Sequence, residues 1–326
     1  MEGEMNVEQF RERCLRPSRK LTDMILLAML VTLGLLFVGL VMQMALEAIL
    51  RSAGILDLSD TGSEDSVLSF LEGYFVFFCI WPATLLAIVL YPANRPMLRD
   101  ILPNRRGNTL TGILLGLLGG FGLNAVCIAI SVLLDDVSLE FFAFEPATLA
   151  LFFAVVFIQS GAEEIITRQF LYEKLRRRYR WPLIAIIGNA LFFALLHLPN
   201  GGAGVIGIAQ CFVVGVLLSL FVYYYHSLWG AIFFHTAWNF TQSILFGCPN
   251  SGIVSSYSLF RLTGASSGPF FDPAFGVEGS IGAVLLIVVL LVAIVIYAKA
   301  KNLRPQDIWA DSDHDEEARR PKHAAA

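Results

Sequence analysis

The sequence is short of charged residues. Only 15% of its 326 residues are Asp, Glu, Lys or Arg, and 56% are hydrophobic, whereas about 25% charged residues is usual in soluble domains. The deficit is concentrated in long apolar runs, which are typical of membrane proteins. The formal net charge of −4 also argues against the basic surface by which proteins bind nucleic acids.

Cysteine is equally sparse, and its spacing excludes two classes of site. The five cysteines form no CxxC pair, and no HExxH sequence is present: they are Cys14, Cys79, Cys127, Cys211 and Cys248. The sequence therefore predicts neither a disulfide framework nor a cysteine-based metal site. We interpret most of these cysteines as small buried hydrophobic residues.

A removable signal peptide and an internal repeat are not expected either. The first twenty residues are polar, and the first apolar run is long enough to span a bilayer, so it should remain as a helix. About 20 mainly apolar residues are needed for one span. By that measure we expect eight spans, at about 21–50, 67–91, 109–134, 146–179, 182–198, 204–225, 228–246 and 281–298.

These spans predict an all-α fold, a polytopic membrane helical bundle with about eight transmembrane helices. The predicted domains are an N-terminal segment at 1–20, a transmembrane domain at 21–300 and a disordered, charged tail at 301–326. The loop at 247–279 is rich in Gly, Ser and Phe. We expect it either to cap the bundle or to be a plain connector.

The charge of the connections alternates along the chain. Lys and Arg cluster before the first span and after the second, fourth and eighth, whereas Asp and Glu cluster after the first and third. Basic connections lie in the cytoplasm by the positive-inside rule. Both termini are therefore predicted to be cytoplasmic, which requires an even number of spans. We expect a multi-pass protein of a prokaryotic plasma membrane.

Several polar side chains interrupt the apolar runs, where they are costly and usually functional. Glu164 and Arg168 are four residues apart, so they share a helix face and can pair. Glu163 is rotated from Glu164 by about 100°, so it can point into a different space. A carboxyl group placed in this way is suited to general acid or base chemistry.

Two later spans add imidazole and amide groups. His235 and Asn239 are four residues apart and can direct two N–H donors at one developing oxyanion. His197 is suited to hold a water molecule beside Glu163. Ser160 has no evident Ser-His-acid arrangement, so the pattern favours attack by water on an amide carbonyl. Asn189 is a fourth polar position.

Each of these residues also has a structural interpretation. A Glu–Arg pair can clamp a helical bundle, and a lone histidine can be a packed, hydrogen-bonded residue. An asparagine can simply bond between helices. The combination of these groups on three helices favours a functional site.

The same residues resemble a known family pattern. Three motifs occur in order on separate predicted spans: EExxxR at Glu163, Glu164 and Arg168, FxxxH at Phe193 and His197, and HxxxN at His235 and Asn239. They are similar to the motifs of the CPBP family, which includes CAAX prenyl-proteases and Abi-type or bacteriocin-processing proteins. The resemblance covers about 150–245. Gln169 departs from it, because family members commonly have Gly there.

The resemblance implies an intramembrane endopeptidase of the glutamate type. It implies Glu163 and His197 as the groups that activate water, and His235 and Asn239 as the oxyanion hole. Supporting roles fall to Glu164, Arg168 and Phe193. It implies no metal or other cofactor, and a substrate that is a prenylated CAAX-type protein or another membrane-associated peptide. The predicted partners are therefore the lipid bilayer and this substrate.

Two alternatives stay open at this point. The histidines and Glu163 could be ligands of a zinc protease, or the chain could be a non-catalytic immunity factor, scaffold or transporter. Helix length places the site at mid-membrane or farther from the cytoplasm. Arg168, Glu173 and Lys174 would give the fourth span a polar face, which predicts a water-filled funnel open to the cytoplasm.

Overall fold

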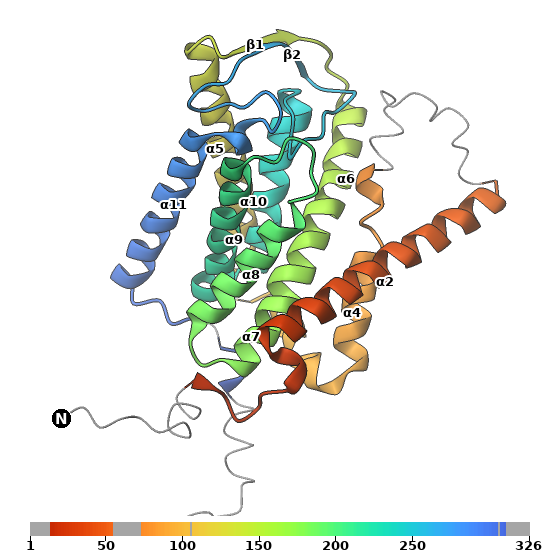
Figure 1. The fold of residues 1–326 in the computed structure, drawn as a ribbon, viewed down its shortest axis with the longest axis vertical. Coiled ribbons are helices and arrows are strands. Elements are labelled where there is room, and N and C mark those ends of the chain that lie inside the picture. The colour runs from red at the N-terminus through yellow and green to blue at the C-terminus, as the bar shows by residue number, and fades with distance from the viewer. Residues whose placement is uncertain (1–13, 55–72, 105, 306, 311–326) are drawn as a thin grey trace, which may run out of the picture.

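The computed structural model describes residues 14–54, 73–104, 106–305 and 307–310, which are mostly helical (Figure 1). This part of the chain contains nine α-helices: α2 (Ile25–Ser52), α4 (Ile80–Leu90), α5 (Leu110–Leu133), α6 (Pro146–Glu164), α7 (Tyr172–Arg178), α8 (Pro182–Leu196), α9 (Val205–Tyr225), α10 (Leu228–Phe240) and α11 (Ile281–Ala300). Shorter helical turns are η1 (Leu21–Asp23), η2 (Pro92–Asp100), η3 (Ile165–Leu171), η4 (Thr241–Leu245) and η5 (Val277–Gly279). The strands are β1 (Val137–Phe141) and β2 (Phe260–Ala265). The predicted helical bundle is confirmed, with a small sheet added to it.

Several helices begin at local signals in the sequence. Proline is the first residue of α6 and of α8, where its missing N–H has no helical partner to lose. The side chains of Thr109 and Ser227 accept hydrogen bonds of 3.1 Å from the backbone N–H groups of Gly112 and Gly230. These caps set the start of α5 and of α10.

Six helical segments are long and apolar enough to cross a membrane: Ile25–Ser52, Gly73–Leu90, Leu110–Leu133, Pro146–Arg178, Val205–Tyr225 and Ile281–Ala300. They support an integral membrane protein. The remaining two expected spans are shorter. The span expected at 182–198 forms α8, which has 15 residues and ends before Pro199. The span expected at 228–246 divides into α10 and the π-helical η4. Eight spans are therefore not confirmed by helix length.

Helix α10 lies inside the bundle, packed against α5, α6 and α9 (Figure 1). Glycines allow α5 to approach it closely. A Cβ atom on Gly116 would collide with the carbonyl oxygen of Gly230, and one on Gly120 with that of Phe234. Small residues of this kind bring membrane helices into backbone contact. The sequence of α5 therefore fixes the position of α10, which carries His235 and Asn239.

The expected continuous fourth span is interrupted near its middle. Helix α6 ends at Glu164, the π-helical η3 follows, and α7 completes the segment. A π-helical turn widens the backbone locally and is frequent at functional sites. The second such turn, η4, comes directly after α10. Both π-helical turns therefore adjoin the segments that carry the candidate site residues.

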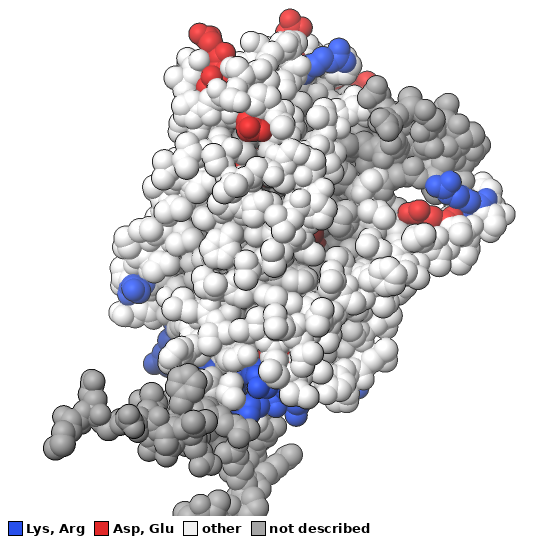
Figure 2. Space-filling view, in the orientation of Figure 1, with Lys and Arg blue, Asp and Glu red and all other residues white. Residues whose placement is uncertain are grey.

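Charge is separated between the two ends of the molecule. Most visible acidic side chains lie at the upper end in Figure 2 and most basic ones at the lower end, with a nearly uncharged band between them. At the upper end β1 pairs antiparallel with β2, which belongs to the loop at 247–279. That loop is therefore folded over the bundle, which favours a cap over a plain connector.

The lower end is closed by buried ion pairs. Asp23 is fully buried and accepts hydrogen bonds of 2.6 and 2.7 Å from Arg177, and Lys174 lies 2.9 Å from the same carboxylate. Glu173 is also buried and accepts a hydrogen bond of 2.8 Å from the indole N–H of Trp309.

These contacts correct two expectations. Arg168, Glu173 and Lys174 do not line a water-filled funnel, because all three are buried and paired with other side chains. The predicted disorder of the tail does not extend to Ile308 and Trp309, which are buried. Residues 311–326 lie outside the described chain.

Candidate active site

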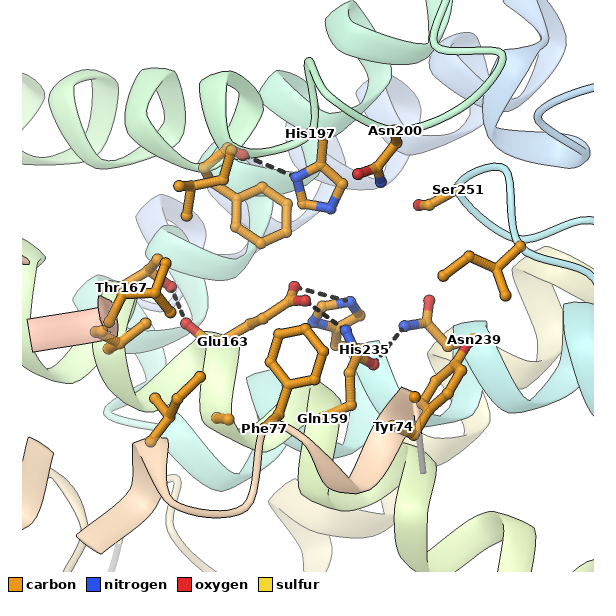
Figure 3. A pocket seen from close by; sticks show the side chains of 18 of the residues that line it. Tyr74, Phe77, Gln159, Glu163, Thr167, His197, Asn200, His235, Asn239 and Ser251 are labelled. Atoms are coloured by element: carbon orange, nitrogen blue, oxygen red, sulfur yellow. Dashed lines mark hydrogen bonds and ion pairs between the residues drawn. The ribbon is translucent and has the colours of Figure 1, made fainter. Parts of the chain in front are cut away.

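A cavity of about 290 Å³ lies among α2, α4, α6, α8 and α10 (Figure 3). Its polar lining includes Gln159, Glu163, His197, His235 and Asn239. Apolar side chains of α2, of the segment that precedes α4 and of the first residue of α4 form part of the remaining wall. The structure therefore brings the four predicted catalytic residues to one cavity, from α6, from α10 and from the residue that directly follows α8.

The two adjacent glutamates have different environments, as their helical spacing predicts. Glu163 is about one-sixth exposed (17%) and lines the cavity, whereas Glu164 is fully buried. Glu163 Oε1 accepts a hydrogen bond from Gln159. Within the described residues its Oε2 atom has no hydrogen-bond partner and lies 3.9 Å from His235 Nε2. One oxygen of Glu163 is therefore free to accept a proton.

Glu164 holds two other residues in place. Its Oε1 atom accepts hydrogen bonds of 3.0 Å from Arg168 and from Nδ1 of His235. The guanidinium group of Arg168 also lies 4.3 Å from the ring centre of Phe193, an attractive cation–π distance. The Glu164–Arg168 pairing expected from the sequence is present. Its connection to His235 and Phe193 follows only from the tertiary structure.

The tautomer of His197 follows from a hydrogen bond to the backbone. His197 Nδ1 lies 2.9 Å from the carbonyl oxygen of Phe193. A carbonyl oxygen only accepts, so Nδ1 carries the proton, and in the neutral ring Nε2 is an acceptor. His197 lines the cavity together with Glu163. Both groups can therefore accept hydrogen bonds from a water molecule there.

His235 presents one nitrogen to the cavity. Its Nδ1–H donates to the carboxylate of Glu164, which leaves Nε2 facing Glu163. Because Nδ1 already carries a proton, Nε2 can donate a hydrogen bond only when the ring is an imidazolium ion. The sequence predicted an imidazole N–H donor at this position but did not indicate this requirement.

The amide of Asn239 is engaged by neighbouring side chains. Its Nδ2 atom donates to Gln159 Oε1 at 3.2 Å and to Ser160 Oγ at 3.4 Å. Its Oδ1 atom accepts from Asn250 at 3.3 Å. An oxyanion role therefore requires one of the two N–H groups to exchange its partner when substrate binds.

Sequence reasoning missed a second layer around the site. Asn250 donates to Asn239 and also to Glu278 at 3.0 Å. Glu278 is buried and accepts further hydrogen bonds from Trp238 at 3.1 Å and from the backbone N–H and hydroxyl of Ser251 at 2.8 and 2.7 Å. No motif marks these loop residues. Gln159 could have been found, because it precedes Glu163 by one helical turn.

Two other polar positions have structural roles. Asn189 donates to Ser219 at 3.0 Å, so it joins α8 to α9 as an interhelical bond. Ser160 is fully buried, and its hydroxyl donates to Gln159 Oε1 at 3.1 Å. No base contacts Ser160 among the described residues, which is consistent with the absence of a serine nucleophile.

The donor set offers no support for a zinc site. In the part of the chain that the structure describes, no group of three His, Cys, Asp or Glu side chains is placed to hold a metal ion. His235 Nδ1 is also occupied by Glu164, and His197 Nδ1 by a carbonyl oxygen. Metal independence itself stays a prediction.

Comparison with known proteins identifies the family pattern. Residues 145–241 match the family model described as type II CAAX prenyl endopeptidase Rce1-like. Comparisons with curated proteins and with solved structures gave no significant match. The matched segment contains Glu163, His197, His235 and Asn239. The predicted resemblance of this chain to the CPBP/CAAX family of membrane proteases is therefore confirmed over the segment that carries these four residues.

Proposed function

We propose that the protein is an intramembrane endopeptidase in which Glu163 activates water for hydrolysis of a peptide bond. The observation that carries this proposal is the joint placement of Glu163, His197, His235 and Asn239 around one cavity. The unpartnered carboxylate oxygen of Glu163 and the accepting Nε2 of His197 suit general-base catalysis. The nitrogens of His235 and Asn239 at the same cavity could stabilise an oxyanion, once an N–H group of Asn239 exchanges its partner.

The proposed reaction uses these groups in order. Water hydrogen-bonded to Glu163 and His197 attacks the substrate carbonyl carbon, and its proton passes to Glu163 Oε2. The carbonyl oxygen becomes an oxyanion, stabilised by Nε2–H of His235 and by Nδ2–H of Asn239. When the C–N bond breaks, Glu163 returns the proton to the leaving amine. The products are a carboxylic acid and an amine, which together account for the water consumed.

We further propose eight membrane crossings with both termini in the cytoplasm of a prokaryotic cell. Arg16 pairs with Asp307 at 2.5 Å, so the two ends of the described chain lie together at the basic end of the bundle. An even number of crossings returns the chain to its starting side. The six long apolar segments, α8, and α10 together with η4 give eight crossings.

The substrate we propose is a CAAX-type prenylated peptide or another membrane-associated peptide. The experiment is proteolysis by the purified protein in liposomes, comparing wild type with Glu163→Gln and with the exposed control Glu140→Gln. General-base catalysis contributes about 10²–10⁴-fold, so Glu163→Gln should lose about that much activity while Glu140→Gln keeps it. Full biological function of Glu163→Gln would instead favour a scaffold or immunity role.

Metal dependence is tested in the same assay. Cleavage should persist in the presence of strong chelators, because we propose that the carboxylate and the imidazole activate water without a metal ion. Inhibition by a chelator, reversed by added zinc, would contradict this part of the proposal and favour the zinc alternative.

A further inference from the structure

A second, much smaller cavity is also lined by His197 and His235. Its volume is about 20 Å³, and it is lined by residues that include His197, Gln210, His235 and Glu278. A cavity of at least about 10–15 Å³ holds one water molecule if it offers polar partners. This cavity is therefore large enough for water but too small for a peptide side chain.

Gln210 has an unused donor at this cavity. Its side chain is 2% exposed, and its Nε2 atom has no hydrogen-bond partner within the described residues. A buried amide donor without an acceptor is unfavourable, because the hydrogen bond it made to water in the unfolded chain is not replaced. Such an atom at the wall of a water-sized cavity indicates a ligand that accepts a hydrogen bond.

Glu278, which lines the same cavity, cannot accept a hydrogen bond from Gln210. Oε1 of this carboxylate already accepts from Trp238 and Asn250, and Oε2 accepts from the backbone and the hydroxyl of Ser251. Four donors use all the usual lone-pair positions of a carboxylate. The Glu278 carboxylate therefore has no lone pair left for Gln210. An acceptor for Gln210 Nε2 has to come from the cavity.

We propose that Gln210 binds a water molecule in this cavity, and that this water supplies the hydrolytic reaction proposed above. The small and the large cavity share Phe193, His197, His235, Asn239 and Ser251 as walls. A substrate in the large cavity displaces the water there, but it cannot enter the small one. Each turnover consumes one water, and the small cavity holds a replacement beside the two imidazoles.

Gln210 is in this view a positioning residue, because it acts through water and does not touch the substrate. The first test is an experimental structure of the wild-type protein at a resolution that shows water. It should contain a water within hydrogen-bonding distance of Gln210 Nε2, and Gln210→Met should lack it. A protein acceptor on Nε2 with no water in the cavity would overturn the proposal.

The second test is kinetic and rests on the proposed function. Loss of one hydrogen bond to the water predicts about a tenfold fall in kcat with an unchanged KM for Gln210→Met. Gln43→Met is the matched control, since Gln43 is a buried amide on α2 outside both cavities, and its kcat should stay at the wild-type value. An unchanged kcat in Gln210→Met would refute the supply role.

The two proposals can fail separately. If the wild-type protein cleaves no membrane-associated peptide but the water is present on Gln210, the protease assignment is wrong and the water site stands. If the wild type cleaves peptide and Glu163→Gln does not, while Gln210→Met matches wild type, only the further inference is wrong.

Discussion

At the residue scale, the neighbouring residues Glu163 and Glu164 differ in the groups that their carboxylates contact. Glu164 pairs with Arg168 and accepts a hydrogen bond from His235, whereas one oxygen of Glu163 has no hydrogen-bond partner among the described residues. Removing one member of a buried ion pair leaves the other charge buried without a partner. This lowers the stability of the fold by more than the loss of the attraction between the two charges. The two glutamates therefore predict different mutant phenotypes.

The first prediction concerns Arg168. Substitution Arg168→Met leaves the Glu164 carboxylate buried without its cation and should destabilise the protein by about 3–5 kcal/mol. Thermal unfolding in detergent measures this. The exposed Lys299→Met provides the comparison and should unfold within about 0.5 kcal/mol of wild type. Equal stability of the two variants would contradict a structural role for the Glu164–Arg168 pair.

The second prediction concerns Asn250, which lies between Asn239 and Glu278. Substitution Asn250→Asp replaces the shared N–H donor with an oxygen that faces two acceptors. Asn239 should turn, and kcat should fall by up to about 10²–10³-fold, the usual cost of losing one oxyanion donor. KM should change little. A parallel rise in KM without a change in kcat would instead assign Asn250 to substrate binding.

At the element scale, the bundle depends on close contact between α5 and α10. Gly116 and Gly120 place the backbone of α5 against carbonyl groups of α10, those of Gly230 and of Phe234, which directly precedes His235. Association of membrane helices relies on such packing, because lipid tails are as apolar as the side chains they replace. A larger side chain at one of these α5 glycines should therefore displace α10 and the candidate site residues that it carries.

The third prediction tests this coupling with two glycines of the same helix. Gly120→Val places a side chain against the backbone of Phe234 and should cost about 1–3 kcal/mol in stability. Gly122 has open space around its Cβ position, so Gly122→Val should be close to wild type. Both are measured by thermal unfolding and by peptide cleavage. If Gly122→Val were the more damaging variant, the α5–α10 contact would not be as described.

At the scale of the whole molecule, the basic end is tied together by segments that are distant in sequence. Asp23 precedes the first span, and its partners Lys174 and Arg177 belong to α7. Burial acts to raise the pKa of Asp23, but the hydrogen bonds and charges of Arg177 and Lys174 outweigh it, so the pKa lies below its usual value of 3.8. The ionised form of Asp23 is therefore part of the folded state.

The fourth prediction is a pH dependence of stability. Since Asp23 binds a proton more readily in the unfolded chain than in the folded one, its contribution is complete above about pH 4 and is lost as the pH falls through the lowered pKa. Wild type should therefore lose stability below pH 4 more steeply than Asp23→Asn, in unfolding scans at matched pH values. Parallel curves for the two proteins would show that Asp23 does not carry this dependence.

The sequence by itself determined the helical bundle and the set of candidate residues. Long apolar runs can satisfy their backbone hydrogen bonds in a membrane only as helices or closed barrels, so composition predicted the architecture. Helical spacing also separated Glu163 from Glu164, because residues one position apart point in different directions. The motifs then indicated a family resemblance, which the match over residues 145–241 confirms for that segment.

Only the tertiary structure decided how these residues are connected. The link from Glu164 to His235 and the layer formed by Asn250 and Glu278 join residues far apart in the chain, and no local pattern encodes such distances. The charged residues of the fourth span predicted a water-filled funnel. In the structure Lys174 pairs with Asp23, and Glu173 accepts a hydrogen bond from Trp309. Asp23 and Trp309 come from opposite ends of the sequence, so no local pattern could show that these residues are buried. Helical periodicity determines the face of the helix on which a side chain lies, whereas tertiary packing determines which residues that side chain contacts.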